Sequence, residues 1–365
     1  MRTILNKYAQ LLVQYCLEIQ PGEKLLIRTT TLAEPLVKEV YRETLKAGGI
    51  AETMLSFSEQ GRILMTEGND TQLGHVPTLY ERAVNEFDAY LFIRAPFNLR
   101  EEQNIPAENA AKRSAALANL SQKYFERTAT RNLKRNLCQF PTQANAQEAG
   151  LSLEEYQNFV FGACKLFGDN PIQSWLQVRS DQQAIVDLLN SRESVQYKGE
   201  GIDISFSTKG RIWMNSDGQT NMPSGEVYTS PVEDSVNGVI HFSYPAIFQG
   251  HEVEGVTLWV KEGYVEKWEA KRGQDFLDRT MAIEGARRFG EAAIGTNYSI
   301  NRFTKNILFD EKIGGTIHMA LGQSYLQTGG KNKSSVHWDM IAGMQNGGEI
   351  WADGEKIYQD GHFIF

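Results

Sequence analysis

The hydrophobic pattern of the first half of the chain is the feature that most limits the possible folds. Segments with apolar residues at spacings of three and four alternate with short continuous apolar runs, and these patterns predict helices and buried strands respectively. The predicted elements are, in chain order, a helix over residues 4–15, a strand over 23–29, a helix over 33–47, a strand over 51–57, a helix over 77–86 and a strand over 87–95. This alternation is typical of a mostly parallel sheet flanked by helices. We therefore expect a doubly wound N-terminal α/β domain.

Helical signals continue beyond these strands. Residues 107–135 form a long polar segment that predicts a helix. Ser152 precedes Glu155 by three positions at the start of an apolar periodic segment, which is the sequence signature of a capping box. Another helix is predicted over residues 172–190.

The pattern changes to period two after a polar segment that contains glycines, so we place a domain boundary near residue 196. The expected domains are residues 1–196 and residues 197–365. Elements predicted in the second domain are strands over 201–207 and 211–216 around a turn at 208–210, two strands around Glu262 and Gly263, a helix over 274–288, and strands over 291–297 and 316–322. Antiparallel strands with few helices indicate an α+β C-terminal domain.

Composition narrows the class of protein. A chain of 365 residues exceeds the roughly 250–300 residues that one hydrophobic core usually holds, which supports two domains. No apolar run approaches the roughly 20 residues of a membrane span, so we expect no membrane role. A net charge of −8 opposes the basic surface that nucleic-acid binding requires. Polar residues interrupt the N-terminal apolar segment, so we expect no secretory signal and a cytoplasmic protein.

Several common chemical motifs are missing from the sequence. The three cysteines, Cys16, Cys138 and Cys164, lie far apart and indicate small buried residues, with no disulfide framework or thiolate zinc site. No dinucleotide-binding or Walker A glycine pattern follows the early strands, and no Gly-x-Ser-x-Gly or His-Glu-x-x-His motif is present. Any chemistry must therefore come from residues dispersed along the chain.

His337 and Asp339 form a His-x-Asp pair whose side chains share one face if residues 336–340 form a strand. An imidazole and a carboxylate on one face could bind one cation. A lone histidine is more often a hydrogen-bonded structural residue, so the pair by itself leaves both interpretations open. His318 lies in another strand-like segment and adds a second candidate imidazole.

Three upstream glutamates, Glu226, Glu291 and Glu311, stand beside small or apolar residues. A carboxylate in an apolar setting must be paired, protonated or metal-bound, because burying it bare costs several kcal/mol. Each also has an ordinary alternative: a turn cap at Glu226, a solvated helix end at Glu291, and a surface pair of Glu311 with Lys312 or Lys305. Taken together with the histidines, the acids suit two divalent ions that share a carboxylate. The lack of thiolates favours Zn, Co, Mn or Mg.

Five sequence blocks carry a family resemblance over nearly the whole chain. They are FPTQANAQEAGLSLEEYQNFVFGA, NMPSGEVYTSP, GEAAIGTN, NILFDEKIGGTIHMALGQSY and NKSSVHWDM. With these blocks the chain resembles the thermophilic metalloaminopeptidase family that includes aminopeptidases T, S and II. The resemblance implies an exopeptidase that acts on peptides with a free N-terminus, with an N-terminal α/β domain and a two-metal centre in the C-terminal domain. It also implies a homodimer that encloses the active sites.

The resemblance also assigns roles to individual residues. The implied metal ligands, with Glu311 as an additional candidate, are Glu226, Glu291, Glu311, His318, His337 and Asp339. Tyr325, seven residues after His318, matches the active-site tyrosine of the family. The segment between this tyrosine and His337 is shorter than in some relatives, so we expect the rim of the pocket to differ here.

Hydrolysis by a metal-activated water is the mechanism that these residues suit. A divalent ion lowers the pKa of water from roughly 15.7 to about 7, and a second ion can polarise the scissile carbonyl. Glu291 lies between the two ligand groups in sequence and is the expected bridging carboxylate. Tyr325 is the expected hydrogen-bond donor to the tetrahedral oxyanion, with a core tyrosine as the alternative.

Other interpretations stay open from the residues alone. Glu233 and Asp234 are candidates for binding the substrate amine, and solvated turn residues are the alternative. A metal- or peptide-binding protein without turnover would carry the same histidines and acids. A two-metal phosphoesterase would need cations near the site, for which Lys331 and Lys333 are the candidates.

Overall fold

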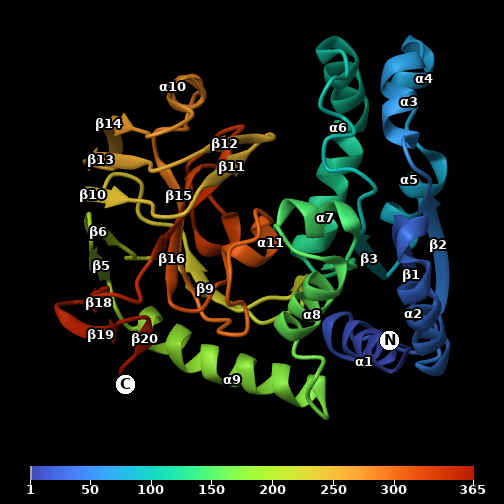
Figure 1. Ribbon diagram of the computed structural model, residues 1–365, viewed down its shortest axis with the longest axis horizontal. Coiled ribbons are helices and arrows are strands. Elements are labelled where there is room, and N and C mark those ends of the chain that lie inside the picture. The colour runs from blue at the N-terminus through green and yellow to red at the C-terminus, as the bar shows by residue number, and fades with distance from the viewer. Residues whose placement is uncertain (1) are drawn as a thin grey trace. The chain divides into compact units, whose positions relative to one another are not determined.

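The computed structural model describes residues 2–365 and divides into two compact units (Figure 1). The first comprises the chain up to Ser174 together with Gly218–Pro223, and the second comprises Trp175–Asp217 and Ser224–Phe365. The boundary expected near residue 196 lies inside the second unit, within strand β5 (Ser194–Gly199), which follows helix α9 (Pro171–Asn190). It marks the change of sequence pattern, whereas the packing divides the chain about 20 residues earlier.

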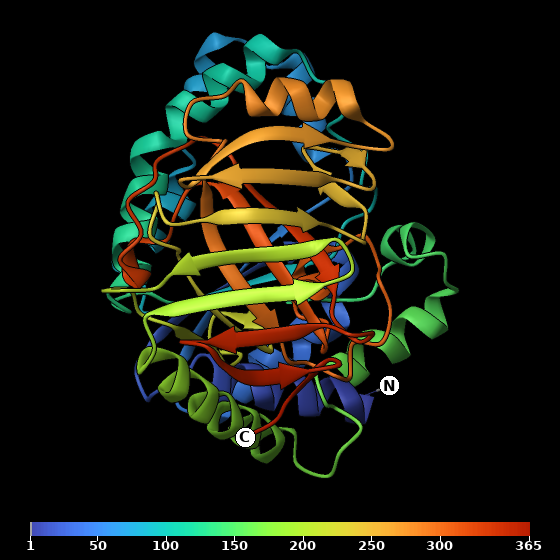
Figure 2. The same cartoon turned by 90° about the vertical axis from the view of Figure 1, so that its left-hand side faces the viewer.

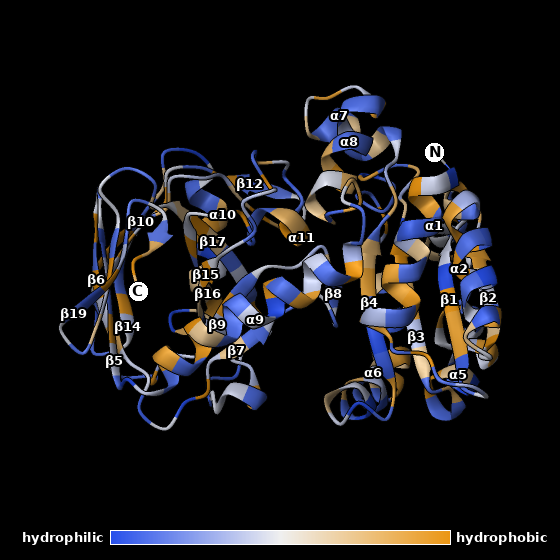
Figure 3. Ribbon diagram, turned by 90° about the horizontal axis from the view of Figure 1, so that it is seen from below, coloured by the Kyte–Doolittle hydropathy of each residue, from blue (hydrophilic) through white to orange (hydrophobic). Residues whose placement is uncertain are grey.

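The first unit is built on a five-stranded sheet in which every neighbouring pair is parallel. In spatial order its strands are β2 (Ile50–Ser56), β1 (Lys24–Thr30), β3 (Ala89–Arg94), β4 (Lys134–Gln139) and β8 (Asn221–Met222). Parallel strands need helical crossovers that cover the sheet. Figure 3 shows β1 mainly in the hydrophobic colour, and Leu25, Leu26 and Ile27 of this strand are buried. The expected α/β architecture is confirmed.

The helices of this unit carry an apolar stripe on one side. Their bounds are α1 (Arg2–Gln10) with a π-helical continuation (Leu11–Cys16), a 3₁₀ turn (Thr31–Ala33), α2 (Glu34–Lys46), α3 (Gln60–Glu67), α4 (Asp70–Gly74), α5 (Thr78–Glu86), α6 (Ala107–Ala129), α7 (Gln143–Glu148) and α8 (Leu153–Ala163). In α2, for example, Leu36, Val37 and Val40 are buried at spacings of one to four, which is the amphipathic pattern of a helix packed on a core.

Two strands of the first unit, β4 and the two-residue β8, were missed by the sequence analysis. The helix predicted over 107–135 ends at Ala129, and β4 begins at Lys134. The strand opens with Lys134, Arg135 and Asn136, so its polar start continues the polar character of the preceding helix. No change of hydrophobicity marks where one element ends and the next begins.

The second unit contains two antiparallel sheets. The larger, seen face-on in Figure 2, has the order β14 (Tyr264–Glu269), β13 (Thr257–Lys261), β10 (Asn237–His241), β6 (Ile202–Ser207), β5, β18 (Glu349–Ala352), β19 (Glu355–Gln359) and β20 (His362–Phe363). The smaller has the order β17 (His337–Gly343), β16 (Thr316–Gly322), β15 (Phe289–Gly295), β9 (Glu226–Thr229) and β7 (Met214–Ser216). The remaining elements are α9, α10 (Gln274–Met281), α11 (Ile307–Asp310), a 3₁₀ turn (Leu326–Thr328) and a hairpin of β11 (Ala246–Phe248) and β12 (His251–Val253).

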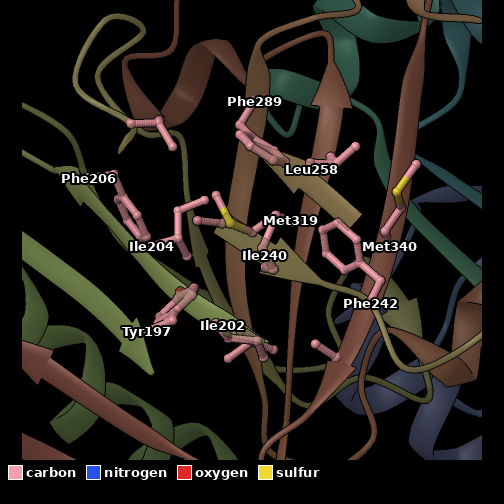
Figure 4. Close-up of a cluster of buried hydrophobic side chains, with 14 of the residues drawn as sticks. Tyr197, Ile202, Ile204, Phe206, Ile240, Phe242, Leu258, Phe289, Met319 and Met340 are labelled. Carbon is pink, nitrogen blue, oxygen red and sulfur yellow. The ribbon is translucent and has the colours of Figure 1, made fainter. Parts of the chain in front are cut away.

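The core of this unit lies between the two sheets (Figure 4). Ile204 and Phe206 of the larger sheet and Met319 and Met340 of the smaller one point into it. Side chains alternate across a strand, so every second residue of β15, β16 and β17 faces this core. The residues between them face the opposite side of the smaller sheet, and that side carries the candidate site.

The strands predicted for this unit are partly confirmed. β13 and β14 form the expected hairpin, with Lys261 opposite Tyr264. The hairpin expected from 201–207 and 211–216 is wrong, because β6 pairs with β5 and β10 whereas β7 pairs with β9. The helix predicted over 274–288 ends at Met281. These differences are in pairing partners and element ends, which local patterns specify poorly.

The capping box of α8 is confirmed and gives a test of local stability. The Ser152 hydroxyl accepts a hydrogen bond from the N–H of Glu155 at 3.2 Å, and the Ser152 N–H donates to Glu155 Oε2 at 2.9 Å. Ser152→Ala should lower the free energy of unfolding by about 1 kcal/mol, because a helix N–H loses its acceptor. Chemical denaturation followed by circular dichroism measures the change. Ser152→Thr keeps the hydroxyl and is the control; equal stability of the alanine variant and the wild type would contradict the prediction.

Candidate metal centre

The residues singled out from the sequence come together on one face of the smaller sheet. Glu226 begins β9, Glu291 lies in β15, His318 lies in β16, and His337 and Asp339 lie in β17. Each is offset by one position from residues that enter the core, such as Val227, Ala292 and Met319. The alternation of side chains therefore separates an apolar face from a face that carries imidazoles and carboxylates.

Strand register brings these residues into neighbouring rows. Asp339 lies opposite Ala320, which in turn lies opposite Glu291. His318 lies opposite Ala293 in the next row. Directly opposed residues lie about 4.5–5.5 Å apart, so the two alanines stand between the larger polar side chains. Their small size leaves room above the sheet for those side chains to converge.

A β-bulge at Gly290 directs Glu291 toward the site. Residues two apart in a strand normally share a face, but Phe289 lies in the core opposite Leu321, whereas Glu291 lies opposite Ala320 on the other face. The extra residue between them produces this switch. A Cβ atom at Gly290 would lie 2.2 Å from the carbonyl oxygen of Gln323, so only glycine fits there.

Glu291 is the carboxylate that contacts both histidines. Its Oε2 lies 3.2 Å from His337 Nε2, and its Oε1 lies 3.7 Å from His318 Nε2. The same nitrogen of His337 lies 3.6 Å from Asp339 Oδ1, and that of His318 lies 3.6 Å from Glu226 Oε2. The four contacts form two groups that meet at Glu291. The sequence analysis singled out this glutamate from its place along the chain.

The donor atoms fit a divalent cation. Ligand atoms of Glu291, His337 and Asp339 all lie within 4.8 Å of one another. Among residues 2–365, Glu226 Oε2, His318 Nδ1 and Asp339 Oδ1 are buried without a hydrogen-bond partner. Buried polar atoms are normally satisfied, and a cation would satisfy the two carboxylate oxygens. Nitrogen and oxygen donors without thiolates suit Zn, Mn, Co or Mg.

Glu311 and Lys312 add a buried ion pair beside this cluster. Lys312 is fully buried, donates to Glu311 Oε1, and lies 3.7 Å from Glu226 Oε1. Burial opposes its charge, but the charges of Glu226 and Glu311 raise the pKa of Lys312, so it is a cation. The ion pair of Glu311 with Lys312, which the sequence analysis considered as a surface pair, therefore exists but is buried. The sequence analysis did not count Lys312 as a site residue; the signal available was a lysine followed directly by Ile313 and two glycines.

Tyr325 faces the histidine side of the cluster. Its hydroxyl lies 3.3 Å from His337 Nε2, and its ring makes an edge contact with Tyr228 at 5.4 Å between centroids. The other ring nitrogen of His337, Nδ1, lies 2.8 Å from the carbonyl oxygen of Gln323. This second contact orients the imidazole and leaves Nε2 toward the carboxylates.

Glu233 and Asp234, the candidates for binding an amine, have different surroundings. Glu233 forms an ion pair with Arg211 and accepts a hydrogen bond from the N–H of Lys331 at 2.7 Å. Asp234 is exposed. Both line a cavity that also contains basic side chains. A substrate amine would have to compete with Arg211 for Glu233.

Burial and neighbouring charges have opposite effects on the pKa values of the cluster, and together they set its protonation. Burial alone lowers the pKa of His318, but its hydrogen bond to Glu291 and the charges of Glu291 and Glu226 raise it to about 9. Burial alone would also lower the pKa of His337, but Asp339 and Glu291 raise it to about 12. Burial raises the pKa of Asp339, but the charge of His337 lowers it to about 2. At neutral pH the metal-free cluster therefore holds two imidazolium ions against the ionised carboxylates of Glu291 and Asp339, whereas burial raises the pKa of Glu311 to about 8.

An α/β unit followed by an antiparallel unit whose sheet carries imidazoles and carboxylates on one face defines a metal-dependent enzyme with nitrogen and oxygen ligands. Comparison with known proteins identifies the family. The model of the thermophilic metalloprotease family M29 matches residues 1–363, and the chain belongs to this family. It is a metal-dependent peptidase, and the resemblance to aminopeptidases T, S and II is confirmed.

Curated relatives and a solved structure extend this similarity over the whole chain. Aminopeptidase 2 of Geobacillus stearothermophilus is 27% identical and is aligned over 99% of this chain and 98% of its own. Aminopeptidase AmpS of Bacillus subtilis is 30% identical over 62% of each chain. Wild-type AmpT from Thermus thermophilus, a solved structure with 23% identity, has a TM-score of 0.85 and covers 99% of both chains. This match confirms the expected two-domain α/β layout.

Family membership also narrows the alternatives that the sequence left open. Membership of a metalloprotease family argues against both a two-metal phosphoesterase and a binding protein without turnover. It also implies a divalent metal cofactor. In the described residues, no helix is both long and apolar enough to cross a membrane.

The charge state of the cluster predicts that metal binding releases protons. Coordination requires neutral imidazoles, whereas His318 and His337, with pKa values of about 9 and about 12, are protonated at pH 7 without metal. Loading Zn²⁺ or Mn²⁺ at pH 7 should therefore release about two protons, and the apparent affinity should rise with pH. Calorimetry in buffers of different ionisation enthalpy measures the release. His318→Gln should release about one proton fewer; a binding enthalpy independent of the buffer would contradict the prediction.

Proposed function

We propose that this protein is an aminopeptidase that removes the N-terminal residue of peptides with a water nucleophile activated by two divalent ions, Zn, Co, Mn or Mg. The observation that carries the proposal is the convergence of two histidines with the carboxylates of Glu226, Glu291 and Asp339. The relatives, all named aminopeptidases, support the exopeptidase class. A homodimer belongs to the same proposal through the family resemblance, and a cytoplasmic location is proposed with it.

The ligands fall into two groups in this proposal. His337 and Asp339 form one group, His318 and Glu226 the other, and Glu291 contacts both histidines. Glu291 is the bridging carboxylate, and the metal-ligand set, Glu311 included, comprises Glu226, Glu291, Glu311, His318, His337 and Asp339. Divalent ions held there supply Lewis acidity, which lowers the pKa of a nucleophilic water and polarises the scissile carbonyl.

Tyr325 is the proposed hydrogen-bond donor to the oxyanion. Burial first, and then the negative charge of Glu291, raise the pKa of Tyr325 well above its ordinary value. Its hydroxyl therefore stays protonated and able to donate. The contact at 3.3 Å to His337 Nε2 holds the hydroxyl at the edge of the ligand cluster, where a carbonyl oxygen under attack would develop its charge.

Lys312 has a positioning role in this proposal. Its ammonium is fixed between Glu311 and Glu226 and reduces the repulsion between the two carboxyl groups.

Recognition of the free amine is assigned to the cluster itself, because Glu233 is engaged by Arg211. A metal ion or an ionised carboxylate of the cluster is the partner for that amine.

Removal of metal tests the proposed function. Treatment with a chelator followed by dialysis should abolish release of the N-terminal residue from leucine anilides and short peptides, and added Zn²⁺, Co²⁺ or Mn²⁺ should restore it. Glu291→Gln should lose bound metal and turnover together, because it removes a charged ligand shared by both groups. Elemental analysis and product chromatography measure the two effects. Glu266→Gln, at an exposed position of β14, is the control. Full activity in metal-free protein would contradict the proposal.

Substitution of the tyrosine tests the oxyanion assignment. Tyr325→Phe should lower kcat about 100-fold or more with little change in KM, as expected for one oxyanion donor. Steady-state kinetics on a dipeptide substrate measures both constants. Tyr41→Phe, at an exposed position of the first unit, is the control. A wild-type kcat in Tyr325→Phe would exclude the assignment and leave a packing role.

A further inference from the structure

The cavity lined by Glu233 and Asp234 has an excess of basic side chains and lies in the same unit as the candidate metal centre. Its volume is about 600 Å³. Charged residues that line it are Lys209, Arg211, Arg288, Lys331, Glu233 and Asp234. Four cations against two anions make it a site that favours an anionic ligand. The proposed mechanism does not use it.

The acidic side chains of the cavity do not cancel its attraction for an anion. Glu233 is already engaged, by the guanidinium of Arg211 and by the N–H of Lys331. The Arg211 side chain is 5% exposed, and its Nε has no acceptor among residues 2–365. A ligand oxygen would satisfy this buried donor. Lys209 also contacts Glu193, at 3.1 Å and in an exposed position, so it contributes less.

Arg288 and Lys331 have N–H donors that are available to a ligand. Arg288 donates one hydrogen bond, from Nη1 to the backbone oxygen of Glu233 at 2.7 Å, and an arginine has five N–H donors. Within the described residues, the ammonium of Lys331 takes part in none of the ion pairs. A guanidinium and an ammonium on one cavity wall suit a carboxylate, which accepts charge-assisted hydrogen bonds from both.

Arg288 directly precedes β15, the strand that carries Glu291. Its guanidinium lies 5.6 Å from the ring centroid of Tyr264, at the start of β14. The carbonyl oxygen of Arg288 accepts a hydrogen bond from the N–H of Gly322 at 2.7 Å, and Gly322 lies opposite His337. Arg288 is therefore two strands from His337, which corresponds to about 10 Å at the usual spacing of strands.

The segment that carries Tyr325 also forms the rim of the cavity. Gly329 and Lys331 line it, and the N–H of Gly330 donates to the carbonyl oxygen of Tyr325 at 3.2 Å. The Thr328 hydroxyl donates to Ser230 Oγ at 2.8 Å, just after β9. These bonds fix the distance between the tyrosine and the basic rim. This rim is the shortened segment in which the sequence analysis expected a difference from some relatives.

We propose that this cavity binds the C-terminal carboxylate of a short peptide whose N-terminal residue lies at the metal cluster. The inference rests on the proposed aminopeptidase function and adds a substrate class to it. An extended peptide advances about 3.3–3.6 Å per residue, so a separation of about 10 Å corresponds to about three residues. Tripeptides and tetrapeptides with a free carboxylate are therefore the preferred substrates.

The experiment compares free acids with C-terminal amides of the same peptides. For Leu-Gly-Gly and Leu-Gly-Gly-Gly, the wild type should show a kcat/KM about tenfold higher for the acid than for the amide. Lys331→Gln, an exposed substitution, and Arg288→Gln should both bring this ratio toward one. Lys333→Gln, two positions further along the same segment and outside the cavity, is the matched control and should keep the wild-type ratio. Thermal unfolding and metal content check that each variant is intact.

The outcomes separate this inference from the function on which it rests. If the wild type cleaves acid and amide equally well, the carboxylate subsite is wrong and the aminopeptidase function stands. If neither is cleaved by metal-loaded protein, the proposed function fails. An amide that ends in aspartate and is cleaved as fast as the free acid would overturn the assignment to the C-terminal carboxylate. An equal advantage for octapeptide acids would overturn the distance argument.

Discussion

The burial of several carboxylates on one face of a sheet is the constraint on which the rest of the site depends. Glu226 and Glu291 are buried, and Glu311 and Asp339 are mostly so; unpaired, each would cost several kcal/mol. His318, His337 and the fully buried Lys312 offset most of this charge. A divalent cation would compensate these carboxylates when the imidazoles bind it in their neutral form.

Core and candidate site are built from the same strands. Each of β15, β16 and β17 contributes one set of side chains to the core between the sheets and the alternate set to the cluster. A well-packed core therefore fixes the spacing of the polar side chains. The bulge at Gly290 is the single break in this alternation within β15, and it directs Glu291 to the polar face. Arg288, which directly precedes the same strand, lines the basic cavity.

Much of the first unit could be predicted because its elements are local. The strands at 23–29, 51–57 and 87–95 and the capping box at Ser152 follow from patterns within about ten residues, and the structure confirms them. β4 was missed because its polar start resembles the helix before it. β5 was taken for a boundary segment because its polar residues face outward on a sheet that requires both the adjacent β6 and the distant β18.

The sequence by itself determined the architecture of the first domain, the strand character of the second, and the residue types of the candidate site, because hydrophobic period and the cost of buried charge act locally. Tertiary structure alone decided the order of strands, the pairing of β7 with β9, and the burial of Lys312 between Glu226 and Glu311. It also decided that Arg288 and His337 lie two strands apart. Residues this far apart in sequence meet only through strand register, which a slip of one position would reverse.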